Sequence, residues 1–386
     1  MHDDGFGAFE AGTAYALFRH GQDRQARQLA EILETVPPAP QTVDVHVHVG
    51  EDEKPPRLIN NLDYSDLEPV EWDDYVGQEP LKTRIMVSIL AAKRKGEAMP
   101  HTLLASGSPG VGKTMMARLI AKQMGASMIE LVPPFNVYTL AEAAMQLCDH
   151  DVLFIDEIHK LADSGKRGAE ILLKVLEDKV MYLPDGTVEK LNDITIIGAT
   201  TDRDMLPETV VDRFKVKPYF QPYTLPELAR ITIQFAAKHD ALGVITDDLG
   251  LTIAKACRST PRVCEEMVMA AADLALAYGR EVSPAELLQF VEVTADGLTR
   301  THVHYLTALY QYFKRERTDG HIEYIVGEAA MQQILRETKQ GIGRLERFLV
   351  ERGLIDRTPR GRRLTERGIK RAKRLITQGL GAADVA

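Results

Sequence analysis

The spacing of apolar residues along the chain changes near residue 223. From about residue 67 to residue 220, short apolar runs alternate with segments of helical periodicity. Three runs have the length and the uninterrupted apolar character of buried parallel strands: 101–106, 152–155 and 194–198. Four segments with helical spacing follow them: 225–240, 249–258, 262–279 and 284–293. This pattern predicts an α/β domain with a doubly wound parallel sheet, followed by an all-α domain.

The spacing of apolar residues also predicts structure near both ends of the chain. Apolar positions between residues 9 and 36 suit an amphipathic helix, and Pro37 and Pro38 end it, so we expect a helical extension followed by a linker. From residue 302 the spacing is again helical, until a turn-rich and arginine-rich stretch at 353–362. Helices followed by such a turn predict a small winged-helix module.

The segment 107–114 matches the phosphate-binding pattern G-x-x-x-x-G-K-[ST]. It follows an apolar run and precedes a helical one, which is the context that the motif requires. Its glycines let backbone N–H groups turn toward phosphates, and the following helix presents its positive end. We expect Lys113 to reach the β- and γ-phosphates and Thr114 to ligate Mg²⁺.

The apolar run 152–155 ends in two carboxylates, Asp156 and Glu157. In open α/β sheets the carboxyl ends of the strands form the crevice where ligands bind. We therefore expect Asp156 to hold Mg²⁺ and Glu157 to orient or deprotonate the attacking water. Together the two motifs predict an ATP hydrolase.

Composition narrows the class of protein. The 386 residues are 45% apolar, enough for several buried cores. The three cysteines include no C-x-x-C pair, so we expect neither a disulfide framework nor a zinc module, and a reducing cytoplasm fits best. No run of about 18 apolar residues occurs, so we expect no membrane span.

Charge is spread unevenly along the chain. Between residues 336 and 374, fourteen Lys and Arg accompany five Asp and Glu, a local net charge of +9 in a chain whose formal net charge is −9. A basic terminal module on an acidic body suggests one specialised surface for a polyanion, although a solvated helix face gives the same pattern.

Four segments lie in or after these motifs: 156–161 (DEIHKL), 196–201 (IIGATT), 211–214 (VDRF) and 259–262 (STPR). They resemble segments of the RuvB family of AAA+ Holliday-junction branch-migration ATPases, the last with Ser259 where the family has glycine. The resemblance implies that Thr201 is the sensor 1 residue and that Arg262 is the sensor 2 arginine. It also implies that Arg213 reaches into the nucleotide site of a neighbouring subunit and stabilises transition-state charge.

The resemblance extends to the adenine side of the site. Tyr75 and Val76 match the family segment that flanks the base, and Tyr223 matches a tyrosine beside the nucleotide, although each also suits ordinary core packing. The implied cofactors are ATP and Mg²⁺. The implied nucleotide-binding set is Tyr75, Val76, Gly110, Val111, Gly112, Lys113, Thr114, Met115, Asp156, Tyr223 and Arg262.

At the C-terminal end, the segment 351–362 resembles the DNA-contacting wing of the family. Arg357, Arg360 and Arg362 lie in a turn that we expect to be too hydrophilic to pack, so we expect all three to meet phosphates. In the family, a long apolar hairpin grips the junction-binding partner RuvA. The corresponding stretch, 180–188, is a shorter hairpin here.

These observations divide the chain into a helical extension (1–36), a linker (37–66), an AAA+ P-loop domain (67–222), an all-α lid (223–298), a winged helix (299–376) and a tail (377–386). The leading hypothesis is a ring-forming motor, hexameric as in the family, that moves DNA duplexes or four-way junctions with a RuvA-like partner. A clamp-loader-like ATPase that remodels a protein on DNA is the alternative, since it shares the nucleotide motifs. A protein unfoldase is less well supported, because residues 133–135 (PPF) do not match its pore loop.

Overall fold

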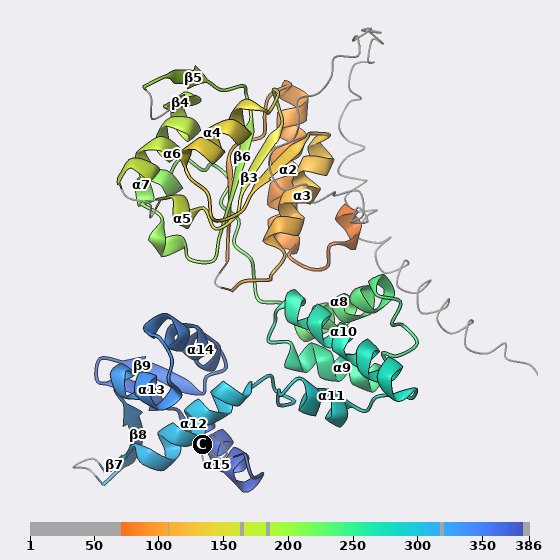
Figure 1. Cartoon of the computed structure of the whole chain (residues 1–386), viewed down its shortest axis with the longest axis vertical. Coiled ribbons are helices and arrows are strands. Elements are labelled where there is room, and N and C mark those ends of the chain that lie inside the picture. Colours follow the sequence, from red (N-terminus) through yellow and green to blue (C-terminus); the bar gives the residue numbers. More distant parts are fainter. Residues whose placement is uncertain (1–70, 107, 163–165, 183–185, 317–319, 381–386) are drawn as a thin grey trace, which may run out of the picture. The chain divides into compact units, whose positions relative to one another are not determined.

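The computed structural model describes residues 71–106, 108–162, 166–182, 186–316 and 320–380 (Figure 1). The expected helical extension and linker lie outside these residues. Among the described helices, none is both long and apolar enough to cross a membrane.

A parallel sheet forms the centre of the first module, with strand order β1-β6-β3-β2. Its strands are β1 (Thr102–Ala105), β2 (Met128–Leu131), β3 (Val152–Ile155) and β6 (Thr195–Thr200). Parallel bridges join Val216 to Thr102 and Tyr219 to Ala105, so the chain continues the sheet beyond β1. All four residues of β3 are buried, as an uninterrupted apolar run requires. The sequence analysis missed β2, whose first three residues are only half-buried.

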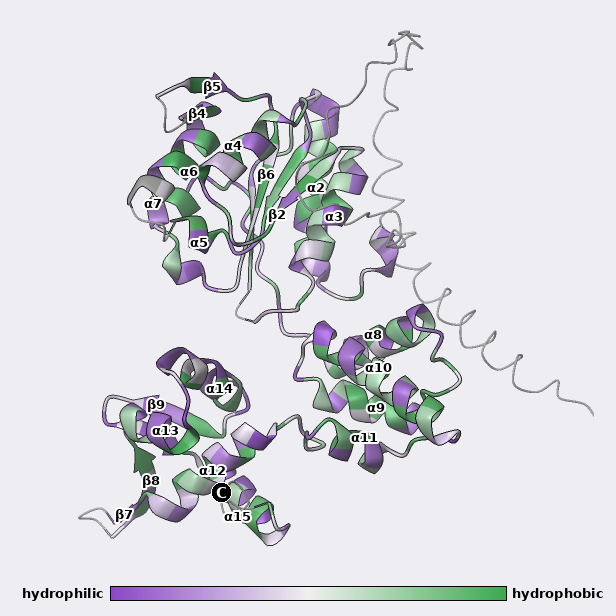
Figure 2. Cartoon of the chain, viewed as in Figure 1, coloured by the Kyte–Doolittle hydropathy of each residue, from purple (hydrophilic) through white to green (hydrophobic). Residues whose placement is uncertain are grey.

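Helices cover both faces of this sheet, with α2 and α3 on one face and α4 and α6 on the other (Figure 1). The helical elements are η2 (Trp72–Asp74), α2 (Glu79–Lys95), α3 (Lys113–Met124), α4 (Val137–Met145), α5 (His159–Ala162), α6 (Lys166–Asp178), η3 (Arg203–Met205) and α7 (Glu208–Val211). Figure 2 shows these helices with hydrophobic and hydrophilic residues on different sides. The predicted doubly wound α/β fold is confirmed.

A small antiparallel hairpin stands apart from the sheet, formed by β4 (Val180–Tyr182) and β5 (Val188–Lys190). It coincides with the hairpin that the sequence predicts at 180–188. Tyr182 and Val188 pair across the two strands, and both are exposed.

Four helices follow: α8 (Leu225–Lys238), α9 (Asp247–Ala256), α10 (Pro261–Tyr278) and α11 (Pro284–Phe290). Local signals in the sequence set their ends. At the start of α11, for example, Ser283 and Glu286 form a reciprocal capping box, and Pro284 occupies the first turn. Buried residues of these helices share one hydrophobic cluster with residues of α2 and α3.

The C-terminal module is a winged helix with an antiparallel sheet in the order β7-β8-β10-β9. Its elements are α12 (Arg300–Tyr312), β7 (Lys314–Glu316), β8 (Ile322–Val326), α13 (Glu328–Leu335), α14 (Lys339–Glu351), β9 (Ile355–Thr358), β10 (Gly361–Leu364) and α15 (Glu366–Thr377). The sequence analysis read only helices between residue 302 and the turn, and so missed β7 and β8. The residues of β7 are all polar and exposed, so they give no alternating apolar signal.

Candidate nucleotide site and winged-helix surface

Three adjacent parallel strands end where the predicted catalytic residues begin. β1 leads to the P-loop, β3 to Asp156 and Glu157, and β6 to Thr201. Since β6 lies between β1 and β3, Thr201 follows the strand that separates the two phosphate-handling motifs. Parallel strands present their carboxyl ends at one edge, so the sheet brings three segments that are far apart in sequence to one site.

The P-loop backbone takes a conformation that only glycine adopts at low cost. Gly110 and Gly112 have φ angles of +72° and +99°. A Cβ on Gly112 would lie 2.5 Å from the Tyr75 hydroxyl oxygen, and one on Gly110 would lie 2.8 Å from Cβ of Arg262. Tyr223 donates a hydrogen bond of 3.0 Å to the Val111 carbonyl. The loop is therefore a tightly enclosed turn at the start of α3, as a phosphate cradle requires.

The Lys113 side chain is buried behind this loop, where its ammonium group donates to the Ser106 hydroxyl at 3.0 Å. Burial lowers the pKa of Lys113, while the nearby carboxylates of Glu157 and Asp156 raise it. Its hydrogen-bond acceptor is thus a neutral hydroxyl, which leaves the charge available to a phosphate. Thr114 and Met115 follow on the first turn of α3, both half-buried.

Asp156 and Glu157 form a close pair of carboxylates at the end of β3. Burial raises the pKa of Asp156, and the charge of Glu157 raises it further. A divalent cation would relieve this repulsion, so the pair suits Mg²⁺, which prefers oxygen ligands. Glu157 has a φ angle of +46°, in the left-handed region that side chains other than glycine enter at a cost.

The Glu157 carboxylate is held by the segment that follows β6. It accepts hydrogen bonds from the Thr201 amide at 3.1 Å and from the Thr201 hydroxyl at 3.0 Å. The buried His159 ring also approaches it, with Nδ1 3.2 Å from Glu157 Oε2 and 2.9 Å from Thr200 Oγ1. The sequence analysis did not assign a role to His159. Its position two residues after Glu157 was the available signal.

Tyr75, Val76 and Tyr223 are buried in the hydrophobic cluster around the P-loop. The Tyr75 hydroxyl lies 3.3 Å from the Gly112 carbonyl oxygen and 3.4 Å from that of Val111. Burial raises the pKa of both tyrosines, so their hydroxyls stay protonated and can donate. The structure therefore places the two tyrosines against the P-loop backbone, where they fix its path.

Arg262 contacts the P-loop through its backbone amide, which donates to the Gly110 carbonyl at 3.3 Å. The turn before it carries the serine that replaces the glycine of the family. Arg258 and Ser259 both have left-handed backbones, with φ angles of +58° and +56°. Ser259 thus adopts a conformation that glycine would take more easily, at a cost of about 1 kcal/mol.

Arg213 is the predicted site residue that the structure does not bring to the P-loop. Its Nε donates to Glu177, in the last turn of α6, at 2.9 Å, and both side chains are partly exposed. An arginine that serves a neighbouring subunit must be exposed in this way. The ion pair is weak enough to exchange partners, since exposed pairs contribute about 1 kcal/mol or less.

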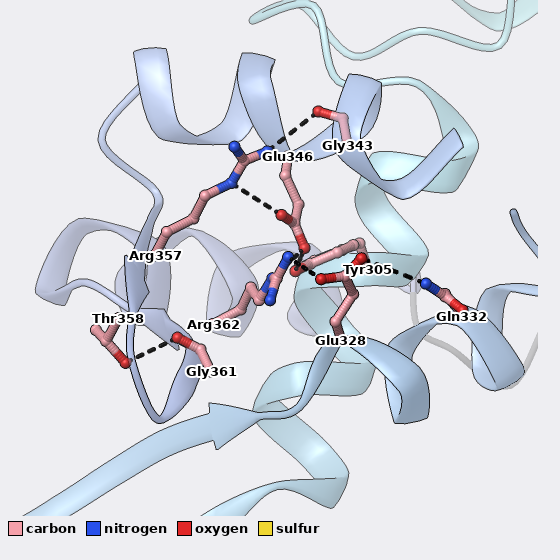
Figure 3. A network of polar contacts seen from close by, with 9 residues as sticks. All are labelled: Tyr305, Glu328, Gln332, Gly343, Glu346, Arg357, Thr358, Gly361 and Arg362. Atoms are coloured by element: carbon pink, nitrogen blue, oxygen red, sulfur yellow. Dashed lines mark hydrogen bonds and ion pairs between the residues drawn. The ribbon is translucent and has the colours of Figure 1, made fainter. Parts of the chain in front are cut away.

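The predicted wing is an ordered hairpin, in which β9 and β10 pair from Gly361↔Thr358 to Leu364↔Ile355. Figure 3 shows the network beneath it. The fully buried Glu346 carboxylate accepts from Arg357 Nε at 3.0 Å, Arg362 Nε at 2.8 Å and the Tyr305 hydroxyl at 2.9 Å. Arg362 also donates to Glu328 at 2.7 Å.

The expectation that the three wing arginines are too hydrophilic to pack is therefore wrong for Arg362, whose side chain is only 19% exposed. Arg357 is exposed as expected, but like Arg362 it pairs with Glu346 on α14, which places a negative charge inside the module. Arg360, between β9 and β10, is exposed as expected. Neither Glu346 nor Glu328 stood out in the sequence, because isolated acids in a helical pattern look like surface residues.

Replacing Arg362 with Ala should destabilise the winged helix. The change removes two ion pairs and leaves the buried Glu346 with fewer partners, at a cost of about 3 kcal/mol. The matched variant, Arg360→Ala, removes an exposed arginine of the same hairpin and should change stability by less than about 0.5 kcal/mol. Hydrogen exchange of the slowest amides in α12 and α14 measures both effects. Equal protection in the two variants would mean that the buried network does not support the module.

Two family models match the chain. Residues 67–219 match the family described as the Holliday junction DNA helicase RuvB P-loop domain, and residues 295–373 match the RuvB C-terminal winged helix domain. The two matches cover the parallel-sheet module and the winged helix, including every predicted catalytic residue.

Comparison with known proteins gives the same assignment. A Holliday junction branch migration complex subunit RuvB from Lawsonia intracellularis is 32% identical over 318 residues, which are 79% of this chain and 89% of that protein. The solved structure of the Thermotoga maritima RuvB Holliday junction branch migration motor matches with a TM-score of 0.66 and 28% identity, over 79% of this chain and 97% of that one. A variant of the same Thermotoga protein gives a TM-score of 0.68 at 27% identity, over 79% of this chain and 98% of that one. The fold, the site residues and these matches together show that the chain belongs to the RuvB family of AAA+ P-loop ATPases.

Proposed function

We propose that the chain is the subunit of an ATP-driven DNA motor that migrates Holliday junctions in recombination and repair. The observation that carries the proposal is the combination, in one chain, of the assembled site at the ends of β1, β3 and β6 with a C-terminal winged helix. The family match supports both parts.

The roles of the site residues follow from their positions. Bound Mg·ATP supplies the γ-phosphoryl group and the metal charge that stabilises its transfer. Lys113, now on the Ser106 hydroxyl, would turn to the phosphates, and Thr114 and Asp156 would hold the metal. Glu157 orients the attacking water and receives its proton, while the Thr201 hydroxyl fixes the direction of that carboxylate.

The remaining nucleotide contacts come from residues that also shape the pocket. The adenine side of the pocket is lined by Tyr75, Val76 and Tyr223 together with the P-loop residues 110–112. Met115, in the first turn of α3, completes the set. Arg262, at the start of α10, links the nucleotide to the lid. Movement of the lid, formed by α8–α11, would then depend on whether ATP or its hydrolysis product is bound.

Arg213 supports the proposal that subunits form a ring, with six members as in the family. Its exposed guanidinium lies away from the P-loop of its own subunit and can serve the site of the next one. The hairpin β4–β5, with exposed Tyr182 and Val188, is the surface that we assign to a RuvA-like partner. The cytoplasm is the proposed location, and the three cysteines are all free thiols.

A clamp-loader-like ATPase shares the nucleotide site, so the winged helix separates the two functions. A module whose charged residues face DNA suits a motor that holds and moves the duplex. No observation on the described part of the chain favours the loader.

The protein should dissociate a four-way DNA junction in an ATP-dependent reaction when a RuvA-type junction-binding protein is present. Gel analysis of labelled junctions measures the product, with a non-hydrolysable ATP analogue as the control. ATP hydrolysis that accompanies junction binding but never yields separated duplexes would contradict the motor and favour a remodelling ATPase.

A further inference from the structure

The basic residues of the winged helix differ in how far neighbouring acids neutralise them. Three of the four arginines in the wing hairpin form ion pairs with acids of the same module: Arg357, Arg362 and Arg363. Within the part of the chain that the structure describes, Arg360 is the hairpin arginine without such a partner. Most of the positive charge of the wing is therefore compensated internally.

Helix α15 has the opposite balance. Arg367, Lys370 and Arg374 are exposed, and none of them forms an ion pair with another described residue. They follow one another at intervals of three and four residues, so they lie in one row along the helix. Arg371, beside this row, is bound to Asp296 by two hydrogen bonds of 2.6 and 2.8 Å.

This row borders a groove of about 1120 Å³ between α15 and the chain that connects α11 to α12. Six cationic side chains line the groove: Arg300, Arg352, Arg367, Lys370, Arg371 and Arg374. Two acids line it as well, Glu292 and Asp296, and the latter is already paired with Arg371. The groove is therefore a strongly cationic surface, separate from the β9–β10 hairpin.

We propose that the α15 groove binds the sugar–phosphate backbone of duplex DNA. The proposal deepens the proposed function, on which it rests, and it adds α15 to the phosphate contacts expected of the wing arginines. Arg367 and Arg374 are seven residues apart, about 10.5 Å along the helix, so their row can follow several phosphates of one strand. None of the lining residues is aromatic, so the groove lacks the stacking platforms typical of single-strand binding.

An acidic polypeptide is the other kind of ligand that such a groove could hold, since leucine and valine side chains also line it. Phosphate contacts have a distinct signature. Each one contributes about 0.9 to the slope of log affinity against log salt, independent of base sequence.

The test is a triple variant of α15 in which Arg367, Lys370 and Arg374 are each replaced by Gln. A second triple variant, Lys93→Gln, Arg94→Gln and Lys95→Gln, is the matched control, because it removes the same charge from exposed positions at the end of α2. All six positions are exposed, so both proteins should fold, which thermal melting checks. Fluorescence anisotropy on duplex DNA at several salt concentrations then gives each slope.

The α15 variant should flatten the slope by about 2.7 units relative to the parent protein, and the control should leave it unchanged. An unchanged slope in the α15 variant, with the parent binding DNA, overturns the groove proposal and leaves the proposed function intact. A parent protein that binds no DNA overturns both. Loss of poly-glutamate binding in the α15 variant without any change in DNA binding would overturn it as well, and would assign the groove to an acidic protein instead.

Discussion

The Glu157→Gln protein should bind ATP as the parent does and hydrolyse it about 10²–10⁴ times more slowly. The reason is geometric. In the proposed mechanism, Lys113 and the P-loop backbone hold the phosphates, whereas the Glu157 carboxylate acts on water. Gln keeps the shape and can still meet the Thr201 hydroxyl, which now lies 3.0 Å away, but it cannot accept a proton from water.

Single-turnover hydrolysis with saturating Mg²⁺, together with retention of labelled nucleotide, separates the two effects. Glu142→Gln is the matched control, because it removes an exposed carboxylate from α4 in the same module. Hydrolysis at the parent rate in the Glu157 variant would show that another group activates the water.

Mixing two inactive variants, Arg213→Ala and Lys113→Ala, should restore hydrolysis. Loss of an arginine finger costs about 10³–10⁵ in rate, so each variant alone should be nearly inactive. In mixed rings, some sites combine the intact P-loop of one subunit with Arg213 of its neighbour. Random assembly of equal amounts creates such a site at roughly a quarter of the interfaces, which sets the activity to expect.

Two controls keep this experiment specific. Lys215→Ala removes an exposed cation two residues away and should leave hydrolysis unchanged. Glu177→Gln frees Arg213 from its partner and should not inactivate the ring, since an exposed pair contributes little. Mixed oligomers without recovered activity, over a range of ratios, would count against a site shared between subunits.

Local signals in the sequence were enough to predict the elements that carry the candidate nucleotide site. An uninterrupted apolar run can only be a buried strand or helix, and the P-loop glycines specify a turn that other residues resist. Residues 152–155 accordingly form β3, and the predicted helix after the P-loop is α3. Polar strands carry no such signal, which is why β7 was missed.

The sequence by itself determined the fold class and the family, and it predicted the residues that we propose handle phosphate, because each depends on short motifs and on the period of apolar positions. Only the tertiary structure decided which charges remain available. Tyr305, Glu328 and Glu346 are far apart along the chain, yet folding joins them in one network with the wing arginines. Charge compensation depends on distances between side chains, and a count of charged residues along a segment contains no distances. For that reason the wing and α15 look equally basic in sequence, whereas in the folded protein acids neutralise most of the wing arginines and leave Arg367, Lys370 and Arg374 of α15 unpaired among the described residues.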